Sequence, residues 1–199
     1  MSNKEKILRQ LNIYFNIRTT EYHGPSELIR RFGISKRTLH RDLDDLNDSG
    51  LLKLKYDRKH DNYVMCNGDG SFLHIKEVQK RTVPIAPRRQ QHLARLYRLG
   101  TLIFSLTPTD TEAVSAYFYD LEMYHFYIDE LMKEEPEKYT IDEAPDKPEL
   151  PDITNLKEEY YSLFPDSSER TRQRDFETLT RAGFPIHYDR RINRYIYEL

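Results

Sequence analysis

Some residue types are scarce in this chain, and each shortage removes a class of protein from consideration. Cys66 is the single cysteine among the 199 residues, so no disulfide can form within the chain and we expect a reducing compartment. No window approaches the roughly 18 consecutive apolar residues of a membrane-spanning helix. The charged amino terminus is not followed by the apolar run of a signal peptide. We therefore expect a soluble, cytoplasmic protein with no membrane partner.

Motifs for metal binding and catalysis are missing as well. The seven histidines are scattered, and there is no His-x-x-x-His, no cysteine pair and no His-Glu-x-x-His, so we expect no metal. Residues 67–70 contain two glycines but lack the Lys-Ser/Thr that follows in a phosphate-binding loop. Acidic pairs such as Asp44 and Asp45 have no pocket context that would give them different catalytic roles. The sequence therefore predicts neither an enzyme nor a cofactor.

A net charge of −2 conceals a strong asymmetry along the chain. Residues 1–66 carry 13 lysines and arginines against 9 acids, and residues 67–107 carry 7 against 2. Residues 108–153 reverse the balance with 3 basic residues against 14 acidic ones, whereas residues 154–199 have 8 of each. The local field governs association with a polyanion more than the total charge does. The basic amino-terminal half therefore makes nucleic acid an expected partner.

Residues 1–68 predict three helices followed by a β-hairpin. Apolar residues at helical spacing, among them Ile7 and Leu11, mark the first helix. The next two helices are bounded by the expected caps Ser26 and Ser35 and by the expected stop glycines Gly33 and Gly50. The apolar stripe of the third helix consists of Leu39, Leu43 and Leu46. Residues 51–55 and 63–65 indicate two strands around a polar turn, which we interpret as a wing.

The carboxy-terminal end repeats this pattern. Residues 37–43 (Arg-Thr-Leu-His-Arg-Asp-Leu) match residues 170–176 (Arg-Thr-Arg-Gln-Arg-Asp-Phe) at an offset of 133. Further pairs align in the same order: Ser35 with Ser168, Gly50 with Gly183 and, at an offset of 132, the Tyr-Asp-Arg of residues 56–58 with that of residues 188–190. A cap, an Arg-Asp pair, a stop glycine and a turn in one order indicate two copies of one structural unit.

Two further helices are predicted between the copies, at residues 88–106 and 110–134. The second of them is capped by Thr109 or Asp110, and its tyrosine-rich stripe favours core or a dimer seam over a platform for stacked bases. The arginines of residues 81–98 lie either on a solvated face or against phosphates. Residues 135–152 contain four prolines and many acids, which predicts an extended linker.

These elements predict a mainly α fold with small β-hairpin wings, in which two winged helix-turn-helix domains are joined by a helical middle region. The expected boundaries are 1–68 for the first winged helix, 69–134 for a helical linker and dimerisation region, 135–152 for the acidic linker and 153–199 for the second winged helix. The third helix of such a unit packs one face on the core and inserts the other into a major groove about 12 Å wide.

The outward face of each third helix suits that task. Arginine and lysine reach guanine or phosphate, serine and threonine bind phosphate oxygens, and glutamine pairs with adenine. In the first copy the expected DNA-binding residues are Ser35, Lys36, Arg37, Thr38, His40 and Arg41, with Arg58 and Lys59 in the wing. In the second they are Ser168, Arg170, Thr171, Gln173 and Arg174, with Arg190, Arg191 and Arg194 in the wing. Glu169 replaces Lys36, which predicts weaker binding by the second copy.

Residues 35–54 and, more closely, residues 168–186 resemble the winged helix of DeoR-type and WYL-domain bacterial regulators. The Ser-x-x-Thr-x-x-Arg-Asp run, the following leucine and glycine, and the tyrosine-containing wing carry this resemblance. It implies sequence-specific operator binding by the recognition helix, usually as a dimer. The chain departs from the pattern in lacking a recognisable WYL effector domain and in placing a second winged helix at its carboxy terminus.

The first hypothesis is therefore a nucleoid-associated transcription regulator, a repressor, that binds double-stranded DNA as a homodimer. The alternative is a protein-interaction scaffold of paired winged helices, which resembles the kleisin-binding accessory subunits of bacterial condensins. The acidic segment leaves room for that alternative, either as a partner-binding element or as a DNA mimic that shields a basic face. An enzyme is the third and most distant hypothesis.

Overall fold

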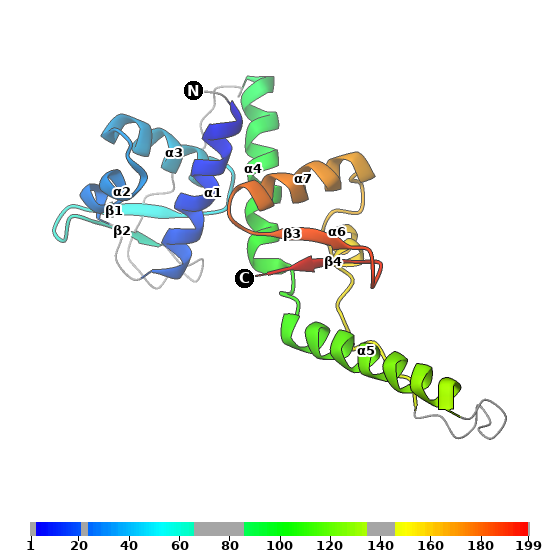
Figure 1. Cartoon of the computed structure of the whole chain (residues 1–199). Helices are drawn as coiled ribbons and strands as arrows, with labels where there is room; N and C mark the ends of the chain where they lie inside the picture. Colours follow the sequence, from blue (N-terminus) through cyan, green and yellow to red (C-terminus); the bar gives the residue numbers. More distant parts are fainter. Residues whose placement is uncertain (1–2, 21–23, 66–85, 135–145, 199) are drawn as a thin grey trace. The chain divides into compact units, whose positions relative to one another are not determined.

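The structure is a computed structural model that describes residues 3–20, 24–65, 86–134 and 146–198. It is mainly helical with two small antiparallel β-hairpins (Figure 1), which confirms the mainly α class expected from the sequence. The helices are α1 (Asn3–Thr19), α2 (Pro25–Phe32), α3 (Lys36–Asp48), α4 (Pro87–Ser105), α5 (Thr111–Glu134), α6 (Leu156–Leu163) and α7 (Glu169–Arg181). The strands are β1 (Leu54–Asp57), β2 (Asn62–Met65), β3 (Ile186–Asp189) and β4 (Arg194–Tyr197), paired as β1-β2 and β3-β4.

The chain forms two compact units. Unit 1 comprises Met1–Leu106 and Asp166–Ile186, and unit 2 comprises Thr107–Pro165 and His187–Leu199. The division differs from the boundaries expected from the sequence because residues of the carboxy-terminal segment, including all of α7, pack with the amino-terminal part. Residues 69–85 of the expected helical linker and residues 135–145 of the expected acidic linker lie outside the described residues.

Unit 1 is built around α1 and α4, which run side by side (Figure 1). Leu11 and Ile13 of α1 are both completely buried, although residues two apart point to nearly opposite sides of a helix. A helix buried on two sides needs neighbours on both, and α1 packs against α3 as well as α4. The sequence predicted a single inward stripe for this helix and missed Ile13, whose burial depends on those neighbours.

The two helices of the repeat, α3 and α7, each pack on this central pair. In Figure 1, α3 lies to the left of α1 and α4, and α7 lies to their right. Each of them contacts both α1 and α4. The central pair therefore provides the inner surface on which both repeated helices are positioned.

Local interactions set the ends of α3 and α7 in the same way. The hydroxyl of Ser35 accepts the N–H of Thr38 at 3.2 Å, and the hydroxyl of Ser168 accepts the N–H of Thr171 at the same distance. Both helices are followed by a glycine at positive φ, 86° at Gly50 and 96° at Gly183, a conformation that side chains disfavour. The expected caps and stop glycines of these helices are confirmed.

The start of α2 differs from the expectation. Gly24 is the N-cap and Pro25 occupies the first turn, so Ser26 lies inside the helix and is not its cap. Proline suits the first helical position because its N–H would have no intrahelical partner there and its φ is already helical. The expected end at Gly33 is confirmed by a left-handed φ of 59°.

The two hairpins share their turn chemistry. Asp61 and Asn193 occupy the same turn position at φ values of 48° and 56°, which short polar side chains tolerate. Each accepts a hydrogen bond from a tyrosine hydroxyl, that of Tyr56 in the first hairpin and that of Tyr188 in the second. The first strand begins at Leu54, three residues later than expected, because Leu52 is still bonded to the end of α3: its N–H donates to the carbonyl of Leu46 at 3.3 Å.

Unit 2 packs the beginning of α5 against the second hairpin. Val114, Ile192 and Ile196 form its buried cluster. Thr109 joins the two segments through hydrogen bonds in both directions with Tyr197, at 2.8 and 3.1 Å. Asp110, one of the two expected caps of α5, accepts the N–H of Ala113 at 2.9 Å. No helix in the described part of the chain is long and apolar enough to span a membrane.

Candidate nucleic-acid interface

The outward face of α3 carries the side chains that the sequence selected. All of them are exposed except Thr38, which is half-buried: Ser35, Lys36, Arg37, His40 and Arg41 are the exposed ones. The opposite face buries Leu39, Leu43 and Leu46, as the stripe predicted. The helical period thus separates a core face from a cationic face along the same 13 residues.

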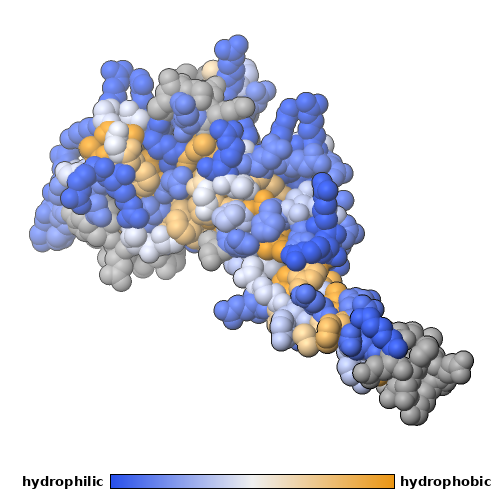
Figure 2. All heavy atoms as spheres, in the orientation of Figure 1, coloured by the Kyte–Doolittle hydropathy of each residue, from blue (hydrophilic) through white to orange (hydrophobic). Residues whose placement is uncertain are grey.

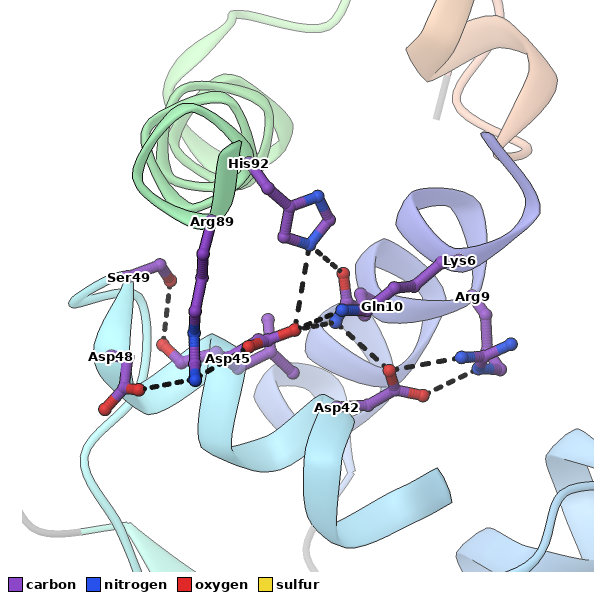
Figure 3. A network of polar contacts seen from close by, with 10 residues as sticks. Lys6, Arg9, Gln10, Asp42, Asp45, Asp48, Ser49, Arg89 and His92 are labelled. Atoms are coloured by element: carbon purple, nitrogen blue, oxygen red, sulfur yellow. Dashed lines mark hydrogen bonds and ion pairs between the residues drawn. The ribbon is translucent and has the colours of Figure 1, made fainter. Parts of the chain in front are cut away.

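Acidic side chains of α3 are held on its inner side by groups from α1 and α4 (Figure 3). Asp42 is 1% exposed and accepts hydrogen bonds from the guanidinium of Arg9 at 2.6 and 3.1 Å. The amide of Gln10 reaches both Asp42 and Asp45, at 3.1 and 3.0 Å. Asp42 thus faces inward, toward the guanidinium of Arg9. The inward carboxylates are therefore compensated inside the protein, and the outward cations of α3 are not needed for that purpose.

Asp45 lies at the centre of this network. It forms ion pairs with Lys6 at 2.6 Å and with Arg89 at 3.0 Å, and Arg89 also binds Asp48 at 2.7 Å. Burial raises the pKa of the Asp45 carboxyl, but the bonds and charges of Lys6, Gln10 and Arg89 outweigh it, so the pKa lies below its ordinary value. Asp45 therefore remains ionised at neutral pH, and its charge is satisfied within unit 1.

His92 of α4 completes the network beside Gln10 and Asp45. One of its ring nitrogens lies 2.9 Å from the side-chain oxygen of Gln10 and 3.7 Å from Asp45. Burial lowers the pKa of His92 below its ordinary value, and the charges of Lys6 and Arg95 lower it further, against the opposite effect of the aspartates. His92 is consequently neutral at pH 7 and donates to the Gln10 oxygen.

An open depression of about 440 Å³ lies beside this network. Its lining combines the ion-paired Lys6, Asp45 and Arg89 with His92 and with Arg41, Asp44 and Arg88. Arg41 and Arg88 are exposed and form no ion pair with another described residue. The depression therefore joins the cationic face of α3 to the first turn of α4.

The outward face of α7 matches that of α3. Ser168, Arg170, Gln173 and Arg174 are exposed, and Thr171 is half-buried. On the inner side, Asp175 is 1% exposed and binds the guanidinium of Arg98, with one of the two bonds at 3.2 Å. Arg95 donates to the hydroxyl of Thr178 at 2.8 Å. As in α3, polar groups on the inner face are bound by cations from the central helices.

One inward position differs between the two helices. Arg172, at the position of Leu39, is 1% exposed and donates to Glu169 at 3.1 Å. Its guanidinium also lies 5.3 Å from the centroid of the Phe176 ring, a favourable cation–π arrangement. Glu169, interpreted from the sequence as a charge that weakens phosphate binding, is thus the partner of a buried arginine.

The hairpins present the remaining expected residues. In unit 1, Arg58 and Lys59 are exposed, and Asp57 shapes their turn by accepting the N–H of Lys59 at 2.9 Å. In unit 2, Arg190 is exposed and Arg194 is half-buried. Arg191 is bound to Asp189 at 2.6 Å and lies 3.8 Å from the centroid of the Phe118 ring, so part of its binding capacity is already used.

The expected residues of the first copy all belong to unit 1. Those of the second copy divide between the units, with the α7 residues in unit 1 and the three hairpin arginines in unit 2. The sequence missed the internal partners of these helices: Lys6, Arg9, Gln10, Arg89, His92, Arg95 and Arg98. Of the arginines in residues 81–98, those at 89, 95 and 98 bind α3 or α7, a role distinct from the two expected for the cluster.

No protein-family model, no curated protein and no solved structure matches this chain. The resemblance to DeoR-type and WYL-domain regulators therefore stays a prediction from the sequence. Within the described residues, no group of three or more potential ligands is placed to hold a metal ion.

Proposed function

We propose that this chain is a sequence-specific regulator of transcription that binds double-stranded DNA. In this proposal α3 and α7 are the recognition helices of two winged helix-turn-helix units, and each inserts its outward face into a major groove. The hairpins act as wings that contact the DNA backbone. Occupation of an operator would act as repression, since DNA binding alone suffices for it.

Four uncommitted arginines carry this proposal. Arg37, Arg41, Arg170 and Arg174 are exposed at equivalent positions of α3 and α7. None of the four forms an ion pair with another residue in the described part of the chain. A guanidinium that projects from the exposed face of a helix and is not ion-paired can donate two bonds to the O6 and N7 atoms of guanine or to a phosphate.

The first turn of each helix adds a second element of recognition. Ser35 and Ser168 hold the first turns in shape through their caps. The amides of a helix amino terminus attract phosphate oxygens, which would fix the helix against the DNA backbone. Lys36 and His40 widen the cationic face of α3, and Gln173 gives α7 a group that pairs with adenine.

Selection of duplexes from a random pool at about 150 mM salt tests the proposal, because weak charge attraction is screened at that concentration. We expect a consensus sequence. Arg37→Ala or Arg41→Ala should then reduce affinity for the selected duplex by about tenfold or more. Lys133→Ala is the matched control, since it removes one exposed positive charge from α5 and should leave the affinity unchanged. Unchanged binding by both arginine variants would contradict the proposal.

The interaction scaffold remains the second candidate, because α5 exposes large apolar side chains. Tyr119 and Phe126 are 65% and 61% exposed, and Met123 and Tyr127 are each 48% exposed. Apolar residues are visible at the surface along α5 in Figure 2. If this were the function of the protein, the duplex selection would give no consensus sequence. Removing the arginine charges of α3, by Arg37→Ala or Arg41→Ala, would then leave the binding of a protein partner to α5 unchanged.

A further inference from the structure

The internal repeat extends further than its sequence shows, because α4 corresponds to α1. In the first copy, Arg9 of α1 binds Asp42 of α3; in the second, Arg98 of α4 binds Asp175 of α7. The offset of 89 residues that relates Arg9 to Arg98 also relates Lys6, which binds Asp45, to Arg95, which binds Thr178, the counterpart of Asp45. The first of these contacts uses the same atoms in both copies, and the second joins equivalent positions with a basic side chain in each.

The burial pattern supports the same correspondence. At an offset of 89, both members of each of the following pairs are buried, in α1 and in α4 or its C-cap: Ile7 with Leu96, Gln10 with Leu99, Leu11 with Gly100, Ile13 with Leu102, Tyr14 with Ile103 and Ile17 with Leu106. The order α4, α6, α7, β3, β4 therefore repeats the order α1, α2, α3, β1, β2, with α5 inserted after the first helix. From here on, the first copy means α1, α2, α3, β1 and β2, and the second copy means α4, α6, α7, β3 and β4.

Contacts between the copies inside unit 1 are reciprocal. Phe15 and Phe104, which are equivalent, stack on each other with centroids 5.7 Å apart and planes 19° apart. Leu51, which follows α3, lies where a Cβ on Gly100 of α4 would be. Phe184, the counterpart of Leu51, packs against Phe15 of α1 at 5.1 Å. Each copy thus places the residue after its third helix on the first helix of the other.

Reciprocity of this kind distinguishes a two-fold relation from a translation. In a two-fold interface the same patch is used on both sides, and equivalent residues meet at the axis; in a head-to-tail interface each patch meets a different one. The Phe15–Phe104 stack and the crossed contacts of α3 with α4 and of α7 with α1 fit the first case. The pair α1–α4 is therefore the internal counterpart of a homodimer interface.

From this arrangement we infer that one chain takes the place of a dimer: α3 and α7 are an inverted pair that reads two half-sites of a single DNA site. This inference rests on the proposed function. Because the two helices belong to one unit, a second copy of the chain is not required to reach the second half-site. The partner is a duplex with two inverted half-sites whose centres are about one helical turn, or a whole number of turns, apart, as two-fold helix-turn-helix dimers require.

The half-sites must differ in sequence, because the two outward faces differ. Lys36 and His40 of α3 correspond to Glu169 and Gln173 of α7. The first face adds the cation of Lys36 to its arginines, which suits guanine and phosphate, whereas Gln173 gives the second face a group that suits adenine. A perfect palindrome would therefore place an unsuitable base opposite one of the helices.

A matched pair of variants on the selected duplex tests this inference. Arg41 and Arg174 are equivalent and exposed. We expect the complex to contain one chain per duplex by native mass spectrometry, on a consensus of two inverted, unlike half-sites. Repeated selection with Arg41→Ala should relax one half-site by about tenfold in discrimination, and Arg174→Ala should relax the other.

The outcomes separate this inference from the proposed function. A consensus bound by two chains, a perfect palindrome, a direct repeat or a relaxation of the same half-site by both variants would overturn the inference and leave DNA binding intact. Absence of any consensus would overturn the proposed function and the inference together. Circular dichroism of each variant excludes loss of folding as the cause, and Lys133→Ala should leave both half-sites unchanged.

Discussion

In the first and second copies the third helix packs on the central pair α1 and α4 through different side chains. In the first copy, α3 buries Leu39 and two aspartates, and Lys6, Arg9, Gln10 and Arg89 compensate the aspartates. In the second, α7 buries Arg172 at the position of Leu39 and a single aspartate of the equivalent pair. The comparison shows that helix position and cap are retained while the charge on the inner face is rearranged. On the outer faces the exposed arginines are retained, as Arg37 with Arg170 and Arg41 with Arg174, whereas Lys36 and His40 are replaced by Glu169 and Gln173.

Replacement of Leu39 in the first copy by arginine, the residue at this position in the second copy, should have the largest effect on the free energy of unfolding. Leu39 is completely buried, and the residue three positions before it is Lys36, where the second copy has Glu169. Leu39→Arg would therefore bury a guanidinium without the acid that Arg172 has. We expect the free energy of unfolding, measured by urea denaturation, to fall by about 4 kcal/mol or more. Leu39→Met is the control and should cost less than about 1.5 kcal/mol; equal losses would show that charge is not the cause.

Removal of the aspartate that occurs at the same position in both copies tests whether its ion pair stabilises the two copies equally. Asp42 and Asp175 are both 1% exposed and both bound by an arginine from the central pair. Asp42→Ala or Asp175→Ala leaves Arg9 or Arg98 largely buried without its carboxylate, so each variant should lose about 3 kcal/mol of unfolding free energy. A loss below about 1 kcal/mol for either variant in the same urea assay would mean that the two contacts are not equivalent.

A smaller effect should follow from pH through His92. Its pKa is lower in the folded protein than its ordinary value of 6.5, so the unfolded chain takes up a proton first as the pH falls. Stability from neutral His92 is therefore complete above about pH 6.5 and is lost below it. Thermal unfolding between pH 7.5 and 5.5 should show a falling midpoint, and His92→Gln should flatten that dependence.

The exposed His40 provides the control for this measurement. His40→Gln removes a histidine from the outward face of α3, where it has no described partner, and should retain the pH dependence of the original chain. If His40→Gln and His92→Gln flattened the dependence equally, a general histidine effect and not the network around Asp45 would be responsible.

The reverse exchange, Arg172→Leu, should have the smallest effect. The variant gives α7 the residue that α3 has, and the released Glu169 is 59% exposed, so water replaces its partner. Replacement of a buried charge by an apolar residue of similar size is often neutral. We expect a change in unfolding free energy of less than about 1 kcal/mol. A loss above about 2 kcal/mol would show that Arg172 stabilises the second copy in a way that Leu39 does not replace in the first.

Local features were predictable to different degrees. The caps Ser35 and Ser168 and the stops Gly50 and Gly183 were identified because each acts on residues within four positions. The prediction of Ser26 as a cap is wrong because Gly24 as N-cap and Pro25 in the first turn together form an alternative helix start. The sequence alone does not rank the two starts. The first strand begins later than predicted because Leu52, although it fits the alternation, is buried and bonded to Leu46 of α3 and not to the other strand.

The basic residues of the candidate interface could be predicted from the sequence, but not which of them are neutralised by acidic partners inside the protein. Arg41 and Arg98 are alike in sequence context, each lying in a basic stretch of a helix. One is exposed on α3, and the other binds Asp175, which lies 77 residues away in the chain. No pattern within one helix distinguishes them, because the partner that neutralises an arginine is set by how helices pack.

By itself the amino-acid sequence determined where the helices α3 and α7 begin and end, which faces they bury and that the two ends of the chain share one pattern, since these depend on bonds between near neighbours. Only the tertiary structure decided that α4 is the counterpart of α1, and which arginines remain available to a ligand. The pairs Lys6 with Arg95 and Ile7 with Leu96 are similar, but Gln10 with Leu99 and Leu11 with Gly100 are not, so sequence comparison does not register the two helices as a repeat. They become equivalent because each occupies the same place against its own third helix.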